Sequence, residues 1–213
     1  MSRTTETTTD PSPFRRAAGG AVAAAGAALI IAALIFSNSF AAQQVAEDAL
    51  VLDYAEATLG ANDITVKSLG QAILLAEDEL LGVADAATSE AALTEARFSI
   101  SELRERATSL INEIGSDAVL SEAASIAIDG AEDVVDLLEN GAVGAAGTRL
   151  AGQGRVDFEA FRDLTRERRD GAADSVTAAT DLMSRIANLA AFVIAFLIPA
   201  TAILAYRRIA KNQ

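Results

Sequence analysis

The uncharged stretch from Ala17 to Phe36, AAGGAVAAAGAALIIAALIF, decides the fold class of this chain. In a helix these residues reach about 30 Å, which is the thickness of the hydrocarbon core of a bilayer. Arg15 and Arg16 lie directly before the stretch. We therefore predict a transmembrane helix over residues 17–36.

A second apolar stretch, Ala187–Tyr206 (ANLAAFVIAFLIPATAILAY), is followed by Arg207 and Arg208 and predicts a transmembrane helix over residues 187–206. Basic residues concentrate on the cytoplasmic side of membrane spans. The two arginine pairs therefore place both termini in the cytoplasm and residues 37–186 on the far side of the membrane. These four arginines and Tyr206 are then membrane-interface residues in contact with lipid.

Pro199 lies inside the second stretch and is expected to kink the helix or to free a carbonyl near residue 195. Such a kink is either a hinge for signal relay or a proline that the helix tolerates.

The segments outside the two spans are short. Residues 1–16 are polar and contain prolines, which predicts a disordered cytoplasmic tail, and residues 207–213 form a basic cytoplasmic tail. Ser39-Phe40-Ala41 leaves a cleaved signal peptide as an alternative. The apolar run is, however, longer than the core of about 7–15 residues that signal peptides have.

Residues 37–186 carry 28 Asp and Glu against 11 Lys and Arg, a net charge of −17. This argues against nucleic acid as a partner, since phosphate binding needs a basic surface. The absence of Cys and His from the sequence removes thiol and imidazole chemistry and the usual zinc ligands. Because the chain also lacks a phosphate loop and a nucleophile elbow, we expect neither an enzyme nor a cofactor.

The periodicity of residues 37–186 is helical. Two parallel seven-residue lines run through the first external segment and keep their register across Gly60–Asp63. They predict one long helix that reaches about Ala86 and is straight or bent at that point. The first line is Val45, Leu52, Leu59, Val66, Ile73 and Leu80, and the companion line is Asp48, Ala55, Asn62, Leu69, Ala76 and Val83.

Three further helices are expected. Thr88-Ser89 is the predicted N-cap of the second helix, and Gly115 is its predicted C-terminal stop. The other boundary signals are Ser116-Asp117 as the cap of the third helix, Asn140-Gly141 as its interruption, Gly152-Gln153-Gly154 as a turn, and Arg155 as the start of the fourth. A chain that leaves and returns through one membrane needs an even number of helices. We thus predict an all-α fold in which two transmembrane helices flank an extracytoplasmic, up-and-down four-helix bundle.

An arginine row on the fourth helix is the candidate ligand site. Arg155, Arg162, Arg166 and Arg169 share one face at about 100° per residue, and guanidinium groups suit carboxylate or phosphate. Arg97 and Arg104 on the second helix would add to this anion site if they face the fourth. The competing interpretation is salt bridging with interleaved acids, where each exposed pair is worth about 0–1 kcal/mol.

Two other features have a possible function. Gly171 is a candidate soft point in the fourth helix, where it would act with Pro199 in signal relay. The acidic clusters Glu77-Asp78-Glu79 and Glu132-Asp133 lack the spacing of a Ca²⁺ loop, so we expect solvated helix faces and no metal site.

Three stretches resemble the four-helix-bundle sensor domains of bacterial chemoreceptors and transmembrane sensor histidine kinases. They are residues 137–150 (LLENGAVGAAGTRL), 154–161 (GRVDFEAF) and 205–213 (AYRRIAKNQ). Asn140-Gly141 stands where that family often has Gly-Asp. The resemblance implies a homodimer in a bacterial plasma membrane. Such a dimer would sense a small molecule or a protein outside the cell and pass a helix displacement inward.

The leading functional hypothesis is therefore a sensory input module for transmembrane signalling, as in two-component systems. The sequence ends at Gln213 without a kinase core, so a cytoplasmic signalling domain or partner would receive the signal. The alternatives are a stand-alone membrane scaffold that binds a protein and passes no signal, and a secreted bundle released by cleavage near Ala41.

Overall fold

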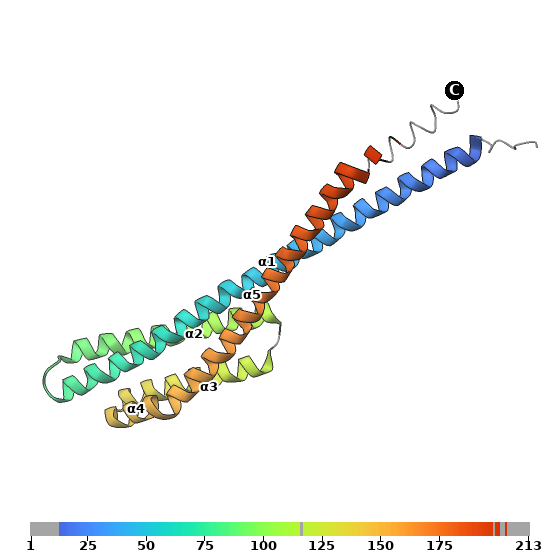
Figure 1. Cartoon of the computed structure of the whole chain (residues 1–213). Coiled ribbons are helices and arrows are strands. Elements are labelled where there is room, and N and C mark those ends of the chain that lie inside the picture. Colours follow the sequence, from blue (N-terminus) through green and yellow to red (C-terminus); the bar gives the residue numbers. More distant parts are fainter. Residues whose placement is uncertain (1–12, 116, 198, 201–202, 204–213) are drawn as a thin grey trace, which may run out of the picture. The chain divides into compact units, whose positions relative to one another are not determined.

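The computed structural model describes residues 13–115, 117–197, 199–200 and 203, and these are helical or in short turns, with no strand among them (Figure 1). This confirms the all-helical prediction. The elements are α1 (Pro13–Leu80), α2 (Ala86–Ile114), α3 (Ala118–Glu139), α4 (Val143–Arg149), the π-helical η1 (Leu150–Gly154), α5 (Arg155–Phe192) and the π-helical η2 (Val193–Leu197).

Helix α1 is 68 residues long and passes through Gly60–Asp63 without a break. The prediction of one long helix is confirmed, although α1 ends at Leu80, before Ala86. Its start at Pro13 makes residues 13–16 helical, so the disordered tail was predicted too long. Proline suits the first turn because its missing N–H would be unpaired there in any case. The rest of that tail, residues 1–12, lies outside the described residues, as do Tyr206, Arg207 and Arg208.

The turn between α1 and α2 is set by Gly82 and Asp85. Gly82 adopts a left-handed φ of 71°, which glycine tolerates without steric cost. The Asp85 carboxylate accepts the backbone N–H of Thr88 at 2.8 Å and its hydroxyl at 2.7 Å. Asp85 is therefore the N-cap of α2, and the prediction of Thr88-Ser89 was wrong because a nearby carboxylate is the stronger acceptor.

The remaining boundaries agree with the sequence signals. Gly115 ends α2 in the left-handed conformation, Asp117 caps α3, and Gly141 separates α3 from α4 with a φ of 73°. Gly152 leaves helical geometry inside η1, at φ −90° and ψ −106°. Helix α5 then starts at Arg155, as predicted.

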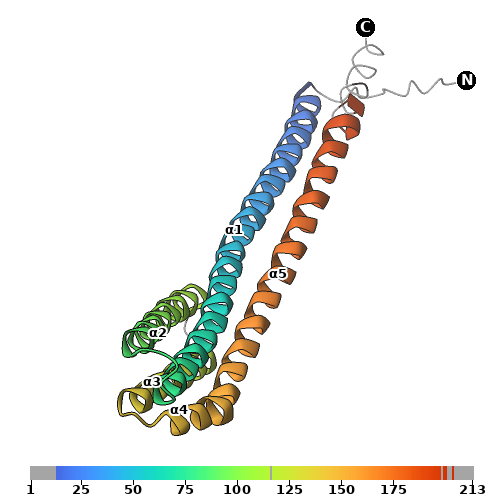
Figure 2. The same ribbon diagram turned by 90° about the vertical axis from the view of Figure 1, so that its left-hand side faces the viewer.

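The chain divides into two compact units, and the boundaries between them fall inside α1 and α5. The first unit, called the helical unit here, is Val45–Ala178, and the second combines Met1–Gln44 with Ala179–Gln213. Figures 1 and 2 show α2, α3 and α4 grouped with the parts of α1 and α5 that belong to the helical unit.

The helical unit has one hydrophobic core to which α1, α2, α3, α4 and α5 all contribute. The companion line of α1 faces this core, with Ala55, Asn62 and Leu69 at most 2% exposed. The first line is less covered, since Val66 and Leu80 are exposed. Among the largest fully buried side chains are Phe161, Leu69, Leu103, Leu110, Leu120 and Val134.

Small hydroxyl side chains connect α1 to α2 inside the core. Thr65 Oγ1 lies 2.8 Å from the Ala61 carbonyl and 3.0 Å from the Ser99 carbonyl, and the Ser68 and Ser99 hydroxyls are 2.6 Å apart. Because these buried groups find partners in nearby carbonyls and in one another, their burial costs little free energy.

The second unit exposes large apolar side chains where it is described. Leu29 and Phe36 of α1 are 72% and 74% exposed, and Phe192 of α5 is 54% exposed. Helices α1 and α5 each contain a segment long and apolar enough to cross a membrane. Lipid is the solvent that accommodates such surfaces.

The π-helical η2 covers residue 195, where Pro199 was predicted to disturb the second span. A π-helical turn bonds each N–H to the carbonyl five residues earlier. The Phe192 and Phe196 rings on this stretch lie 5.1 Å apart between centroids.

Candidate functional site: a groove between α1 and α5

The predicted arginines do not form one cluster. Arg97 and Arg104 of α2 pair with Glu139 and Glu132 of α3, the second pair at 2.6 Å. They therefore connect α2 to α3 and do not extend the row on α5.

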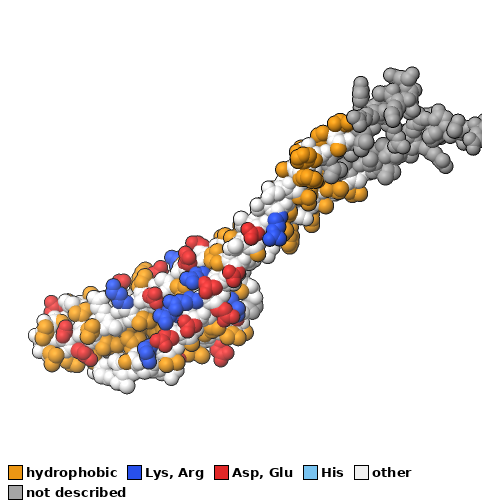
Figure 3. Space-filling model, viewed as in Figure 1, with side chains coloured by type: hydrophobic (Ala, Val, Ile, Leu, Met, Phe, Trp, Pro, Cys, Tyr) orange, Lys and Arg blue, Asp and Glu red, His pale blue; other side chains and the backbone are white. Residues whose placement is uncertain are grey.

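Two arginines of the α5 row pair with acids of their own helix. Arg166 lies 3.8 Å from Asp163, and Arg169 lies 2.7 Å from Asp170. Such exposed pairs contribute at most about 1 kcal/mol each. Figure 3 shows this mixture, with Lys and Arg side chains grouped on one face of the helical unit among Asp and Glu.

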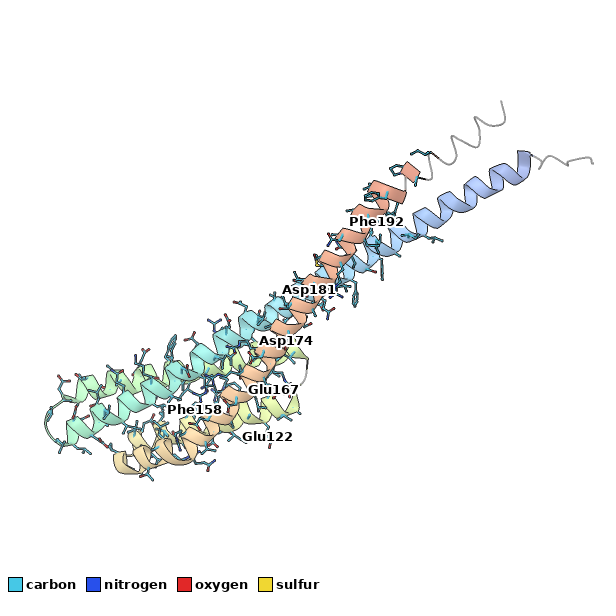
Figure 4. The ribbon with its side chains drawn as sticks, in the orientation of Figure 1. Glu122, Phe158, Glu167, Asp174, Asp181 and Phe192 are labelled. Atoms are coloured by element: carbon cyan, nitrogen blue, oxygen red, sulfur yellow. The ribbon has the colours of Figure 1, made fainter. Side chains whose placement is uncertain are left out.

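The other two arginines of the row, Arg155 and Arg162, line a groove of about 460 Å³ in the helical unit. The groove runs between α1, η1 and α5, so α1 supplies residues that the arginine row alone did not indicate. Its lining residues are Asn62, Asp63, Val66, Lys67, Leu150, Ala151, Arg155, Phe158, Glu159 and Arg162. Phe158, labelled on α5 in Figure 4, is 3% exposed.

Two polar atoms of the groove residues are buried without a hydrogen-bond partner in the described part of the chain, namely Asn62 Oδ1 and Arg162 Nε. The Asn62 residue is 2% exposed, and the nearest carboxylate oxygen recorded for Arg162 Nε, from Asp163, is 4.0 Å away. Buried polar atoms in folded proteins are nearly always paired, so Asn62 Oδ1 and Arg162 Nε distinguish this groove from the rest of the described surface.

The groove also contains a cationic side chain of the helical unit that has no carboxylate partner among the described residues. Each arginine between Val45 and Ala178 has a carboxylate oxygen within 4.0 Å. Among the described residues Lys67 forms no such pair, and it lines the groove. With Lys67, Arg155 and Arg162 against Asp63 and Glu159, the lining carries one net positive charge inside a strongly acidic domain.

Sequence reasoning missed Asn62 and Lys67 as site residues. The signal was present for Asn62, because an amide in a buried seven-residue line is unusual among apolar neighbours. Nothing in the periodicity distinguished Lys67, whose role depends on the approach of α5.

A second polar cluster joins α3, α4, η1 and α5 around Arg149. Arg149 lies 3.5 Å from Asp157 and 3.4 Å from Asp133, and Gln153 Nε2 donates to Asp157 at 2.7 Å. A Cβ built on Gly130 would be 2.8 Å from the Arg149 guanidinium. This cluster holds α3, α4 and α5 together.

Asp117 joins α3 to α5. Its carboxylate accepts the backbone N–H of Leu120 at 3.1 Å and lies 2.6 Å from Arg168 Nε. These contacts hold the pKa of the Asp117 carboxyl below its usual range, the bond from Leu120 having the largest effect and Arg168 following. The sequence predicted the cap but not its bond to Arg168.

Replacing Asp117 with asparagine should make the free energy of unfolding change less with pH in the acid range. A lowered folded-state pKa adds stability above the unfolded-state pKa of about 4, and this is lost as pH falls through the folded-state value. Asparagine keeps the cap but not the charge, so D117N should be less stable than the parent by about 1 kcal/mol at pH 7. Urea titrations at neutral and acid pH measure the difference in unfolding free energy between D117N and the parent, which should shrink in acid. The R168Q variant should show the same loss at pH 7 and the same decrease in acid. A difference that is constant with pH would contradict this account.

No group of three or more Asp or Glu residues able to hold a metal ion occurs among the described residues. No protein-family model, curated protein or solved structure matches this chain. The functional interpretation consequently rests on the chain's own residues.

Proposed function

We propose that this chain is a membrane-embedded sensory input module. The helical unit would be an extracytoplasmic four-helix bundle that binds a ligand or partner, and α5 would carry the resulting displacement into the second membrane span. The observation that supports this proposal is that α1 and α5 each continue, without interruption, from the helical unit into an exposed apolar segment.

A continuous helix suits signal relay because its backbone hydrogen bonds resist local bending. A ligand that favours one of two helix arrangements shifts the population of both ends of such a helix together. Gly171 lies within α5, is exposed and would leave room for a Cβ, which supports it as a soft point. Beyond Phe192, η2 and Pro199 form a second irregular place in the same path.

The membrane orientation is testable because the sequence contains no Cys, so any engineered thiol is unique. We expect S101C on α2 and S121C on α3, both at exposed positions, to react with a membrane-impermeant maleimide in intact cells. S2C, before the first span, should react only after lysis. Labelling of the two helical-unit thiols only after lysis would overturn the topology.

Relay requires two copies whose α5 helices approach each other, so we expect a helical pattern of crosslinks. Single-Cys variants along residues 170–192, oxidised in native membranes, should crosslink with a period of about 3.6 residues that continues past Ala178. Inserting four glycines between Ala178 and Ala179 should change which positions crosslink below the insertion while those above stay the same. An unchanged pattern, or no crosslinks between copies, would contradict the relay and favour the stand-alone scaffold.

A further inference from the structure

We propose that the groove between α1, η1 and α5 binds a small organic monocarboxylate with an apolar body, held through Arg162 and Lys67, with Asn62 accepting a hydrogen bond from a donor next to the carboxylate. The inference rests on the proposed sensory function in one respect, namely that the bound molecule would be the stimulus. Binding itself depends on the groove alone.

The charge of the ligand follows from the lining. Arg155 already lies 3.8 Å from Glu159 across one helical turn. In the described part of the chain, Arg162 Nε and Lys67 are then the cationic donors of the groove without a hydrogen-bonding carboxylate. A single carboxylate would neutralise the net positive charge of the groove, whereas a dicarboxylate would add repulsion from Asp63 and Glu159. Charge-assisted hydrogen bonds of this kind are roughly twice as strong as neutral ones.

The shape and chemistry of the rest of the groove point to an apolar body. Val66, Leu150, Ala151 and Phe158 contribute hydrocarbon to the lining, and a volume of about 460 Å³ lies within the range of small-molecule sites. Inorganic phosphate would use the cations but would leave this apolar surface in contact with water. A carboxylate with a phenyl or branched alkyl group would cover it.

The orphaned atom of Asn62 adds the third feature. A buried carbonyl oxygen needs an O–H or N–H donor, and a hydroxyl on the carbon next to the carboxylate can supply one. Mandelate has all three features, and phenylacetate is the same molecule without the hydroxyl. Sites that hydrogen-bond a ligand hydroxyl discriminate strongly against the analogue that lacks it.

The test is calorimetric titration of the full chain, in lipid nanodiscs, with mandelate, phenylacetate, acetate and inorganic phosphate. We expect mandelate to bind most tightly, phenylacetate at least about tenfold more weakly, and acetate and phosphate not measurably. Phosphate binding as tight as that of mandelate would replace the carboxylate with a simple anion site. Equal affinity for mandelate and phenylacetate would remove the role of Asn62.

Arg162 and Arg166 form a matched pair for the second part of the test. They lie one turn apart on α5 and both approach Asp163, but only Arg162 lines the groove. R162Q should weaken mandelate binding at least about tenfold, and R166Q should leave it unchanged. Equal effects of the two variants would overturn the assignment.

In N62L an apolar group replaces a buried side chain whose Oδ1 has no hydrogen-bond partner among the described residues. We therefore expect the variant to keep its stability, so that a change in binding reports the lost acceptor. N62L should abolish the preference for mandelate over phenylacetate. A preference that persists in N62L would overturn the role of Asn62.

Crosslinking of the single-Cys α5 variants with and without mandelate separates this proposal from the sensory function. Binding that leaves the crosslinks in the second span unchanged would remove the sensor and keep the site. If none of the four probes binds, the proposed site is wrong. The topology and crosslinking experiments would then still test the sensory function.

Discussion

Replacing Phe161 with alanine is expected to lower the free energy of unfolding of the helical unit by about 4 kcal/mol. Phe161 is fully buried, at 0% exposure, and is among the largest side chains of the core. Its loss removes the transfer free energy of the ring and leaves a cavity that the surrounding core residues can close only in part. Because α5 packs on the core through this residue, the substitution should loosen the contact of α5 with the rest of the unit.

The measurement is urea unfolding of the full chain in detergent micelles, followed by circular dichroism of the helices. F98A is the matched control, since Phe98 on α2 is 65% exposed and its truncation should change stability by less than about 0.5 kcal/mol. Similar losses for F161A and F98A would mean that α5 does not pack on the core as described.

Replacing Arg149 with methionine is expected to cost about 3 kcal/mol, because it leaves a buried carboxylate without its countercharge. Asp157 is 8% exposed, and after the substitution only the Gln153 amide would hydrogen-bond it. Methionine keeps much of the apolar stem of arginine, so the loss reports the charge more than the packing.

A double variant tests this explanation. Adding D157N to R149M should restore most of the lost stability, since a neutral amide needs no countercharge, and the same urea titration measures it. R155M is the control, because Arg155 is exposed and its recorded ion pair within the described residues is the one with Glu159 at 3.8 Å. The cost of R155M should stay below about 1 kcal/mol. If D157N gives no recovery, the cost of R149M comes from lost packing against Gly130.

Much of the helical framework could be predicted from the sequence because its signals are local. The unbroken lines through Gly60–Asp63 indicated a continuous α1, and Gly115 and Arg155 marked an end and a start that the structure confirms. The N-cap of α2 was misplaced because three polar residues lie close together there, and only the backbone geometry decides that Asp85 accepts the bonds.

The candidate site was predicted only in part. The predicted arginine row includes Arg155 and Arg162, which line the groove, but it was grouped with Arg97 and Arg104, which pair with α3. Periodicity shows which residues share a face of one helix. It does not show which neighbouring helix that face meets, because acidic residues occur on α1, α2, α3 and α5 and any of them could pair with an arginine.

The sequence by itself determined the helices, their main boundaries and the two apolar segments, because propensity, capping and hydropathy depend on residues close together in the chain. Only the tertiary structure decided that Asn62 and Lys67 of α1 lie in the same groove as Arg162 of α5. The physical reason is that the packing of side chains in the shared core fixes how α1 and α5 approach each other. Among the described residues, that approach leaves one buried amide oxygen and one guanidinium nitrogen without a hydrogen bond, and one lysine without a carboxylate, in a single groove.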